Sequence, residues 1–136
     1  MSVFVFDSSA VLRYLDHEAG AERVKAILRC SANESSAICI SALQWGEIAA
    51  VLRKRYGAVE QKRNLANLVE LQFRVIAVSA ERAVRAAAIR VDRKMAFADA
   101  FGIELAMDSP EHLLVTSDYD FKKVEDLARI EFLPVK

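Results

Sequence analysis

Acidic residues at the ends of apolar runs are the first candidates for chemistry in this sequence. Residues 3–6 (VFVF) form a short apolar run that stops at Asp7, and a second run, 113–116 (LLVT), ends two residues before Asp118. Both runs have the length and composition of buried strands. Because an ionised carboxylate is costly to bury alone, a carboxylate at the end of a buried strand needs a partner or a ligand.

Two further carboxylates fall among apolar residues in segments with helical periodicity. Glu47 lies one turn from Leu43 and one turn from Val51, which predicts a position at the edge of an apolar stripe. Asp99 has small or apolar residues as its helical neighbours. Each position also has an ordinary interpretation: Glu47 as an edge residue that reaches water, and Asp99 as a helix-start residue favoured by free amides and by the helix dipole.

Other acidic residues have simpler interpretations. Glu104 and Asp108 are expected on the solvated face of the helix that carries Asp99. Asp120 comes directly before another helical segment, so capping of that segment is its simplest role. Asp118 comes too early in the chain for that role, which leaves it as a candidate for the same site as Asp7.

Convergence of Asp7, Glu47, Asp99 and Asp118 would bring four negative charges into one cleft. Most of them have no lysine or arginine beside them in the sequence. A hard divalent cation with oxygen ligands, Mg²⁺ or Mn²⁺ rather than zinc, would offset such a concentration of carboxylates. Neighbouring hydroxyl groups could orient the carboxylates or metal-bound waters; they belong to Ser8, Ser9, Thr116 and Ser117.

The elements that must position these residues alternate along the chain. Strands are predicted at 3–6, 36–40, 73–78, 113–116 and 129–133, and helices at 9–15, 19–30, 42–55, 59–71, 79–93 and 97–108. Short apolar strands alternating with helices predict an α/β fold with a mainly parallel sheet covered on both faces. Ligands bind outside the carboxyl ends of the strands in such sheets, and Asp7 and Asp118 are predicted at that edge.

Composition limits the classes of protein to which this chain can belong. Its 136 residues suit one domain spanning residues 1–136, and no apolar stretch is long enough to cross a bilayer. The amino-terminal residues lack the pattern of a secretion signal, so a cytoplasmic protein is expected. The net charge is zero, with 19 basic and 19 acidic residues, so any contact with nucleic acid must be local.

Basic residues near two of the carboxylates are candidates for that local contact. The possible phosphate contacts are Arg53, Arg55, Arg93 and Lys94. They have an equally ordinary interpretation as solvated residues at helix ends, where the dipole favours cations. Tyr14, Trp45 and Tyr119 could stack on unpaired bases, although core packing is the simpler role for Trp45.

The acidic motifs taken together resemble the PIN domain family, and in particular the VapC-type toxins of toxin–antitoxin pairs. The resemblance runs from Val3 to Leu133 and rests on VFDSSAVL, SALQWGEIAAVL, FADAFGIELA and LLVTSDYDF, in that order. It implies a three-layer α/β/α sandwich, a metal-dependent endoribonuclease, a homodimer and a cognate antitoxin. By the same resemblance the metal ligands and catalytic residues are Asp7, Glu47, Asp99 and Asp118, with Asp120 as a possible further contributor.

Two alternatives remain open at this stage. One is a non-catalytic domain of the same fold that binds RNA or protein. The other is a Mg²⁺-dependent phosphatase of the haloacid-dehalogenase type or a phospho-receiver domain. The phosphatase would need a second aspartate two residues after Asp7, where this chain has Ser9, and the receiver would need an acceptor aspartate near Ser79. A histidine-based ribonuclease mechanism has no support, because His17 and His112 are isolated.

Overall fold

A computed structural model of the chain describes residues 2–33 and 36–136. The strands of this part are β1 (Ser2–Phe6), β2 (Ser36–Ser41), β3 (Arg74–Ile76), β4 (His112–Thr116) and β5 (Arg129–Phe132). The helices are α1 (Ser8–Leu15), α2 (Ala21–Ala32), α3 (Ala42–Glu70), α4 (Ala80–Arg93) and α5 (Phe97–Ala106), with a 3₁₀ helix, η1 (Tyr119–Val124). Within these ranges, none of the helices has both the length and the apolar character needed to span a bilayer.

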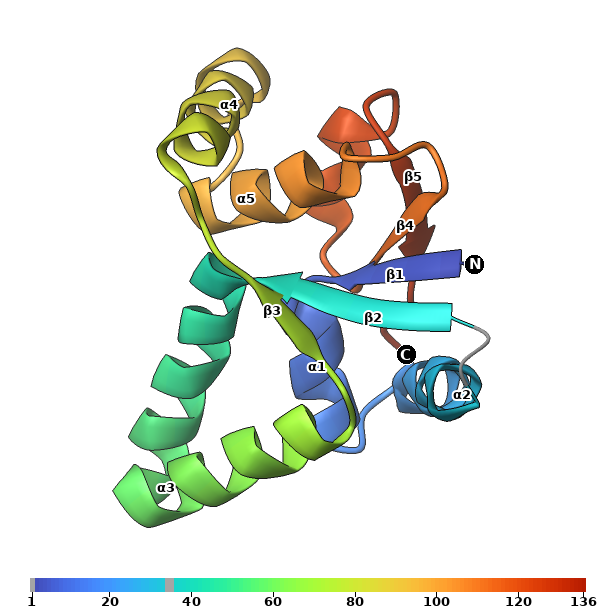
Figure 1. Cartoon of the computed structure of the whole chain (residues 1–136), viewed down its shortest axis with the longest axis vertical. Helices are drawn as coiled ribbons and strands as arrows, with labels where there is room; N and C mark the ends of the chain where they lie inside the picture. The colour runs from blue at the N-terminus through green and yellow to red at the C-terminus, as the bar shows by residue number, and fades with distance from the viewer. Residues whose placement is uncertain (1, 34–35) are drawn as a thin grey trace.

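The five strands form one parallel sheet in the order β3-β2-β1-β4-β5. The chain therefore starts at the centre of the sheet, builds outward to β3, and then returns to add β4 on the other side of β1 (Figure 1). The direction of building reverses between β1 and β4. In open parallel sheets, the carboxyl ends of the strands at such a reversal are where ligands bind.

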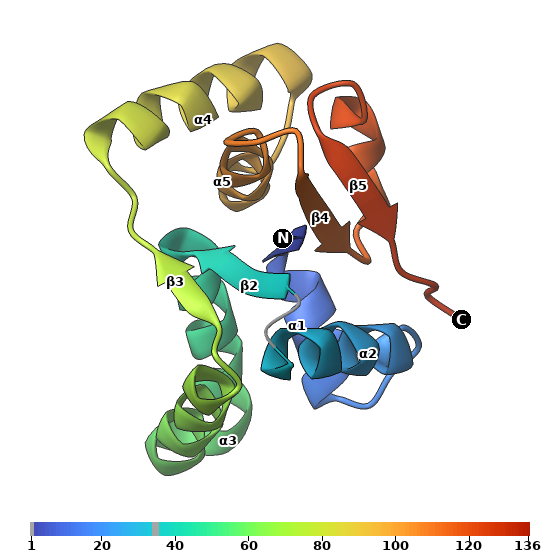
Figure 2. The ribbon, with the colours of Figure 1, turned by 45° about the vertical axis from the view of Figure 1, so that its right-hand side comes forward.

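Alternating side chains along the strands separate the core into two halves. On β1, Phe4 and Phe6 face the apolar residues of α1, α2 and α3, whereas Val3 and Val5 face those of α4 and α5. Figures 1 and 2 show the sheet between these two layers of helices, with α4 and α5 on one side and α1, α2 and α3 on the other. The predicted α/β class and the three-layer sandwich are therefore confirmed.

One element agrees closely with the sequence prediction and one differs. The helices predicted at 42–55 and 59–71 are the two halves of α3, which meet at a sharp bend at Gly57, where the dihedral angles are non-helical (φ 86°, ψ 178°) (Figure 1). The third strand is shorter than predicted. Its last pairing joins Ile76 to Ser41, and because β2 ends at Ser41, this edge strand has no neighbour to pair with beyond that point.

Candidate metal and catalytic site

Asp7 is the buried centre of the candidate site. It follows β1 directly and occupies the position before α1, with an extended backbone (φ −79°, ψ 152°). Its side chain makes no capping hydrogen bond to α1, and its backbone N–H donates to the carbonyl oxygen of Val115 at 3.0 Å. Asp7 is only 1% exposed, so its carboxylate must be satisfied by groups inside the protein.

Three side chains donate hydrogen bonds to the Asp7 carboxylate. Oδ2 accepts from Thr116 Oγ1 at 2.8 Å and from Ser9 Oγ at 2.5 Å, and Oδ1 accepts from Gln44 Nε2 at 2.5 Å. Burial raises the pKa of Asp7, and the charges of Asp118 and Glu47 raise it further, while the hydrogen bonds from Ser9 and Thr116 act in the opposite direction. The donors therefore hold a carboxylate whose surroundings are otherwise unfavourable to charge.

Hydroxyl groups join the carboxyl ends of β1 and β4. Thr116 Oγ1 accepts from the backbone N–H of Asp118 at 2.9 Å, and Ser9 Oγ accepts from the backbone N–H of Ser117 at 3.1 Å. Both hydroxyls also donate to Asp7. Ser9 and Thr116, two residues for which the sequence predicts a supporting role, thus fix Asp7 relative to the backbone that leads into Asp118.

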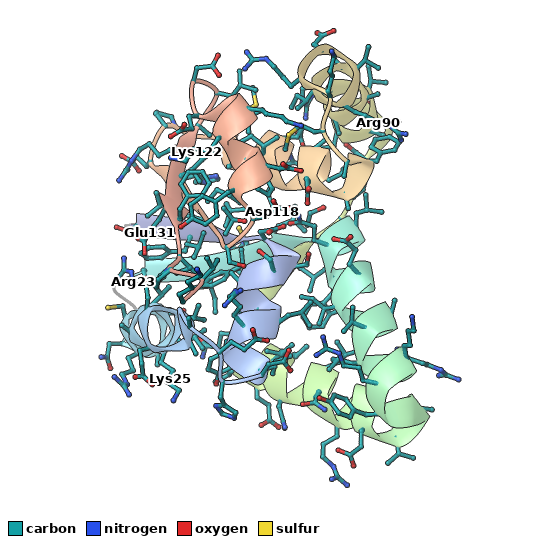
Figure 3. All side chains as sticks on the ribbon, turned by 180° about the vertical axis from the view of Figure 1, so that it is seen from behind. Arg23, Lys25, Arg90, Asp118, Lys122 and Glu131 are labelled. Atoms are coloured by element: carbon teal, nitrogen blue, oxygen red, sulfur yellow. The ribbon has the colours of Figure 1, made fainter. Side chains whose placement is uncertain are left out.

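Asp118, and not Asp120, caps the helical segment that follows β4. The Asp118 carboxylate accepts from the backbone N–H of Asp120 at 2.9 Å, and η1 begins at Tyr119. The prediction that Asp120 is the cap is wrong, because the 3₁₀ helix starts almost directly after the strand. Asp120 instead lies exposed in the first turn of η1. Figure 3 shows Asp118 at the centre of the molecule, beside the ribbons of α1 and α5.

Glu47 and Asp99 reach the same region from two helices. Glu47 is exposed on α3, and its Oε1 accepts from Ser8 Oγ at 3.0 Å. Asp99 lies half-buried in the first turn of α5. Burial raises the pKa of Asp99 to about 7, together with the charges of the four other carboxylates, Asp7, Asp118, Glu47 and Asp120. The structure therefore brings together all five predicted acidic residues, called the carboxylate cluster below.

The chemistry of the carboxylate cluster fits a hard divalent cation. Its members supply carboxylate oxygens, with hydroxyl oxygens beside them, and such ligands suit Mg²⁺ or Mn²⁺. Among residues 2–33 and 36–136, no ion pair involves Asp7, Glu47, Asp99 or Asp118. In the same part of the chain, no three His, Cys, Asp or Glu side chains are already arranged to hold an ion. The donor set of the carboxylate cluster nevertheless fits a hard divalent cation.

Glu104 shows how the same fold treats a carboxylate that has only a structural role. It lies on α5 and is 3% exposed, in contrast to the predicted solvated position. Arg82 Nη1 and Arg85 Nε each lie 3.0 Å from its Oε2, and Arg82 also pairs with Asp108 and lowers the pKa of that carboxyl. The prediction failed because α4 packs against α5 and covers this face with guanidinium groups. Within residues 2–33 and 36–136, Asp7 and Asp99 have no guanidinium partner of this kind.

The buried stripe in the first half of α3 runs through Gln44, Ile48 and Leu52. Glu47 lies at its edge, as predicted, and is exposed, whereas Leu43 is 38% exposed and lies outside the stripe. Gln44 contacts Asp7 directly, and the sequence analysis missed it. Its spacing of four and eight residues from two apolar positions is the signal that could have identified it.

The predicted phosphate contacts differ in their surroundings. The four residues are Arg53, Arg55, Arg93 and Lys94. Arg55 Nη1 pairs with Asp16 Oδ2 at 2.7 Å, and Arg93 Nη1 pairs with Asp126 Oδ1 at 2.6 Å. The other two are exposed and have no ion pair within the described ranges. Of the four, Arg53 and Lys94 are thus the two that present a positive charge without an acidic partner in the described part of the chain.

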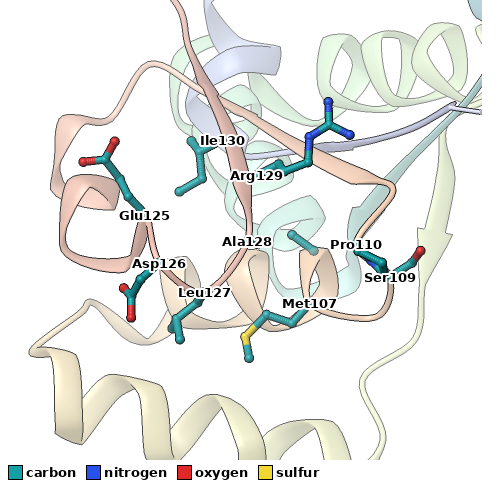
Figure 4. Close-up of a pocket in the computed structure, with 10 residues that line it drawn as sticks. Met107, Ser109, Pro110, Glu125, Asp126, Leu127, Ala128, Arg129 and Ile130 are labelled. Atoms are coloured by element: carbon teal, nitrogen blue, oxygen red, sulfur yellow. The ribbon is translucent and has the colours of Figure 1, made fainter.

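A cavity of about 640 Å³ lies at the opposite edge of the sheet (Figure 4). It is lined by the end of α5 and by residues 125–130, which lead into β5. Met107, Ser109 and Pro110 line its other side, just before β4 begins. These are the amino ends of β4 and β5, so this cavity is separate from the carboxylate cluster at the carboxyl ends.

Comparisons with known proteins agree with this geometry. The PIN domain family matches residues 4–127. No curated protein matches the chain. VapC20 of Mycobacterium tuberculosis, described as a sarcin-ricin loop cleaving toxin, is similar over 98% of this chain and 100% of its own, with 22% identity and a TM-score of 0.71. Also similar is the DNA-bound VapBC of Salmonella typhimurium, with 18% identity and a TM-score of 0.69 over 97% of this chain and 98% of that chain. VapBC2 of Rickettsia felis bound to a promoter DNA fragment is similar with 15% identity and a TM-score of 0.70, over 97% of this chain and 99% of that chain. The match over residues 4–127 shows that this chain belongs to the PIN domain family.

Proposed function

We propose that this protein is an endoribonuclease that depends on Mg²⁺ or Mn²⁺ and acts as the toxin of a type II toxin–antitoxin pair. The observation that carries the proposal is the carboxylate cluster, gathered at the carboxyl edge of β1 and β4 and without a basic partner in the described ranges. Membership of the PIN domain family supports a nuclease, and the similarity to VapC20, described as a sarcin-ricin loop cleaving toxin, supports RNA as the substrate.

Four carboxylates would hold the cation, namely Asp7, Glu47, Asp99 and Asp118, with Asp120 close enough to contribute. When bound, Mg²⁺ or Mn²⁺ would supply an activated water and stabilise negative charge on a phosphodiester. The chain itself contributes orientation: Ser9 and Thr116 hold Asp7 through Oδ2, and Ser8 holds Glu47. Neither histidine is in the sequence motifs of the cluster, so we assign no histidine a catalytic role.

Two cations and one aromatic ring are the substrate contacts that we propose from the chain. Arg53 and Lys94 are exposed and suited to bind phosphates. Tyr119 is 46% exposed and directly follows Asp118, and its ring stacks on Phe132 with centroids 5.1 Å apart. An aromatic ring that is already held in place is suited to stack on an unpaired base next to the cleaved phosphate.

We further propose a cognate antitoxin and a homodimer as partners. The similar proteins of Salmonella typhimurium and Rickettsia felis are VapBC complexes, which supports the antitoxin. The homodimer rests on the resemblance to VapC-type toxins alone.

The experiment that tests the proposal is incubation of the purified protein with a mixed RNA pool, with Mg²⁺, with Mn²⁺ and with chelator. Asp99→Asn is the inactive variant, and Asp92→Asn, on the exposed face of α4, is the matched control with the same change of charge. We expect metal-dependent cleavage by the wild type and by Asp92→Asn, and none by Asp99→Asn. Equal cleavage by all three proteins would contradict the assignment of the site.

A second candidate function is a non-catalytic domain that binds RNA or protein. Isothermal titration of the same samples with Mn²⁺ separates it from a nuclease whose target is missing from the pool. Metal binding by the wild type that is lost in Asp99→Asn supports the nuclease. No binding by either protein supports the non-catalytic domain.

A further inference from the structure

We infer that Gln44 is the positioning residue of Asp7 and that Gly102 is required for it; this inference rests on the metal site of the proposed function. The motif that brought Glu47 into the site contains Gln44 three residues earlier, on the buried face of α3. Gln44 is 0% exposed, which is unusual for a polar side chain on a helix that carries charged residues on its other faces.

The hydrogen bonds of Asp7 divide its two oxygens into two roles. Oδ2 accepts from both Ser9 and Thr116, which uses both of its lone pairs. Among the residues that the structure describes, Gln44 is the one donor to Oδ1, which leaves one lone pair of this oxygen. A cation bound through Asp7 would therefore meet Oδ1, and the Gln44 amide sets the direction in which that remaining lone pair points.

The carbonyl oxygen of the Gln44 amide shows that this side chain is more than ordinary core packing. Its Oε1 is buried and has no hydrogen-bond partner among the described residues. A buried, unpartnered polar atom is unfavourable, and an apolar side chain at this position would avoid it. Packing alone therefore does not explain a glutamine here, whereas a donor for Asp7 does.

Gly102 of α5 leaves the space that this amide occupies. A Cβ at residue 102 would lie 2.8 Å from Gln44 Oε1 and 3.0 Å from Nε2. Any larger residue would push the amide away from its place beside Asp7. The contact also sets the spacing between α3 and α5, the two helices that carry Glu47 and Asp99. One buried amide thus links three members of the carboxylate cluster.

The test is a double-mutant cycle read out by Mn²⁺ binding in titration calorimetry, with no RNA present. The variants are Gln44→Ala, Gly102→Ala and the double variant, together with Gln44→Met, which keeps the length of the side chain but lacks the donor. We expect the Kd for Mn²⁺ to rise about tenfold or more in Gln44→Met and Gln44→Ala, the range for loss of a group that orients a metal ligand. Gly102→Ala should have a similar effect alone and little additional effect in the Gln44→Ala background.

A purely structural role would lower the melting temperature of these variants and leave the Kd of the folded protein unchanged. A Kd within twofold of the wild type in folded Gln44→Met would therefore overturn the inference. If circular dichroism shows that Gln44→Met is unfolded, Gly102→Ala decides by the same criterion, because it retains the glutamine. A wild type that binds no Mn²⁺ would overturn the proposed metal site itself, which is a separate result and is measured first.

Discussion

Asp99→Asn should stabilise the metal-free protein at neutral pH while it abolishes metal binding. Asp99 has the charges of Asp7, Glu47, Asp118 and Asp120 around it, and its pKa is raised to about 7. A carboxyl whose pKa is higher in the folded than in the unfolded protein binds more protons when folded, so stability falls as the pH rises from about 4 to about 7. Asparagine at this position removes that loss of stability because it carries no charge at any pH.

The size of this stabilisation follows from the pKa shift of Asp99. The pKa moves from 3.8 to about 7, which corresponds to an upper limit of about 4 kcal/mol at neutral pH. Asp99 is partly exposed, and solvent screening reduces this to roughly 1–2 kcal/mol. For a domain of this size, that gain corresponds to a rise in Tm of roughly 4–8 °C. At pH 5 the gain should be about half of this or less, because the wild-type carboxyl is then largely protonated.

Urea unfolding of both proteins in chelator, at pH 5 and pH 7.5, measures the difference. Saturating Mg²⁺ should narrow or reverse the difference in stability between the two proteins, because only the wild type gains stability from binding the metal. An Asp99→Asn variant that is less stable than the wild type in chelator at pH 7.5, or equally affected at both pH values, would refute the reasoning. Asp7→Asn is a poorer choice, because Ser9, Thr116 and Gln44 all donate to that carboxylate and an amide would set a donor against a donor.

Three further predictions concern the metal, the ion pairs and the substrate. Addition of Mg²⁺ or Mn²⁺ at 100 times its Kd should stabilise the wild type by about 2.7 kcal/mol, and chelator should reverse the gain in a thermal shift assay. Arg82→Met should cost roughly 2–4 kcal/mol in urea unfolding, because it removes one of two guanidinium groups from buried Glu104; a cost below 0.5 kcal/mol would show that Arg85 suffices. Tyr119→Leu should weaken binding of unpaired RNA about fivefold or more, while Tyr119→Phe, which loses only the hydrogen bond to Leu133, should bind nearly as the wild type does in a filter assay.

The parts of the site that could be predicted from the sequence are those that depend on strand ends. Asp7 and Asp118 each follow an apolar run, and parallel strands place such ends at one edge of a sheet, so their proximity follows from local pattern alone. Asp99 could be identified because its helical neighbours are small or apolar. These inferences need only the period of the strand or helix and the cost of burying a charge.

What could not be predicted depends on how the helices pack. The stripe through Leu43 and Glu47 is as apolar in sequence as the stripe through Gln44 and Ile48, and the elements packed against α3, namely α1, α5, β2 and β3, decide which one is buried. The same applies to Glu104, whose partners lie on α4, about 20 residues earlier in the chain. Periodicity indicates which residues share one face of a helix, but the neighbouring elements determine which face is buried.

The two ends of α5 differ in how their charges are balanced. Near its carboxyl end, two arginines of α4 pair with Glu104, whereas at its amino end Asp99 lies among the charges of four other carboxylates, which raise its pKa. A cation that neutralises the carboxylate cluster would therefore relieve repulsion at the amino end of α5 and leave the ion pairs near its carboxyl end as they are. The link between α5 and α4 through Glu104 would then be the same with and without the ion.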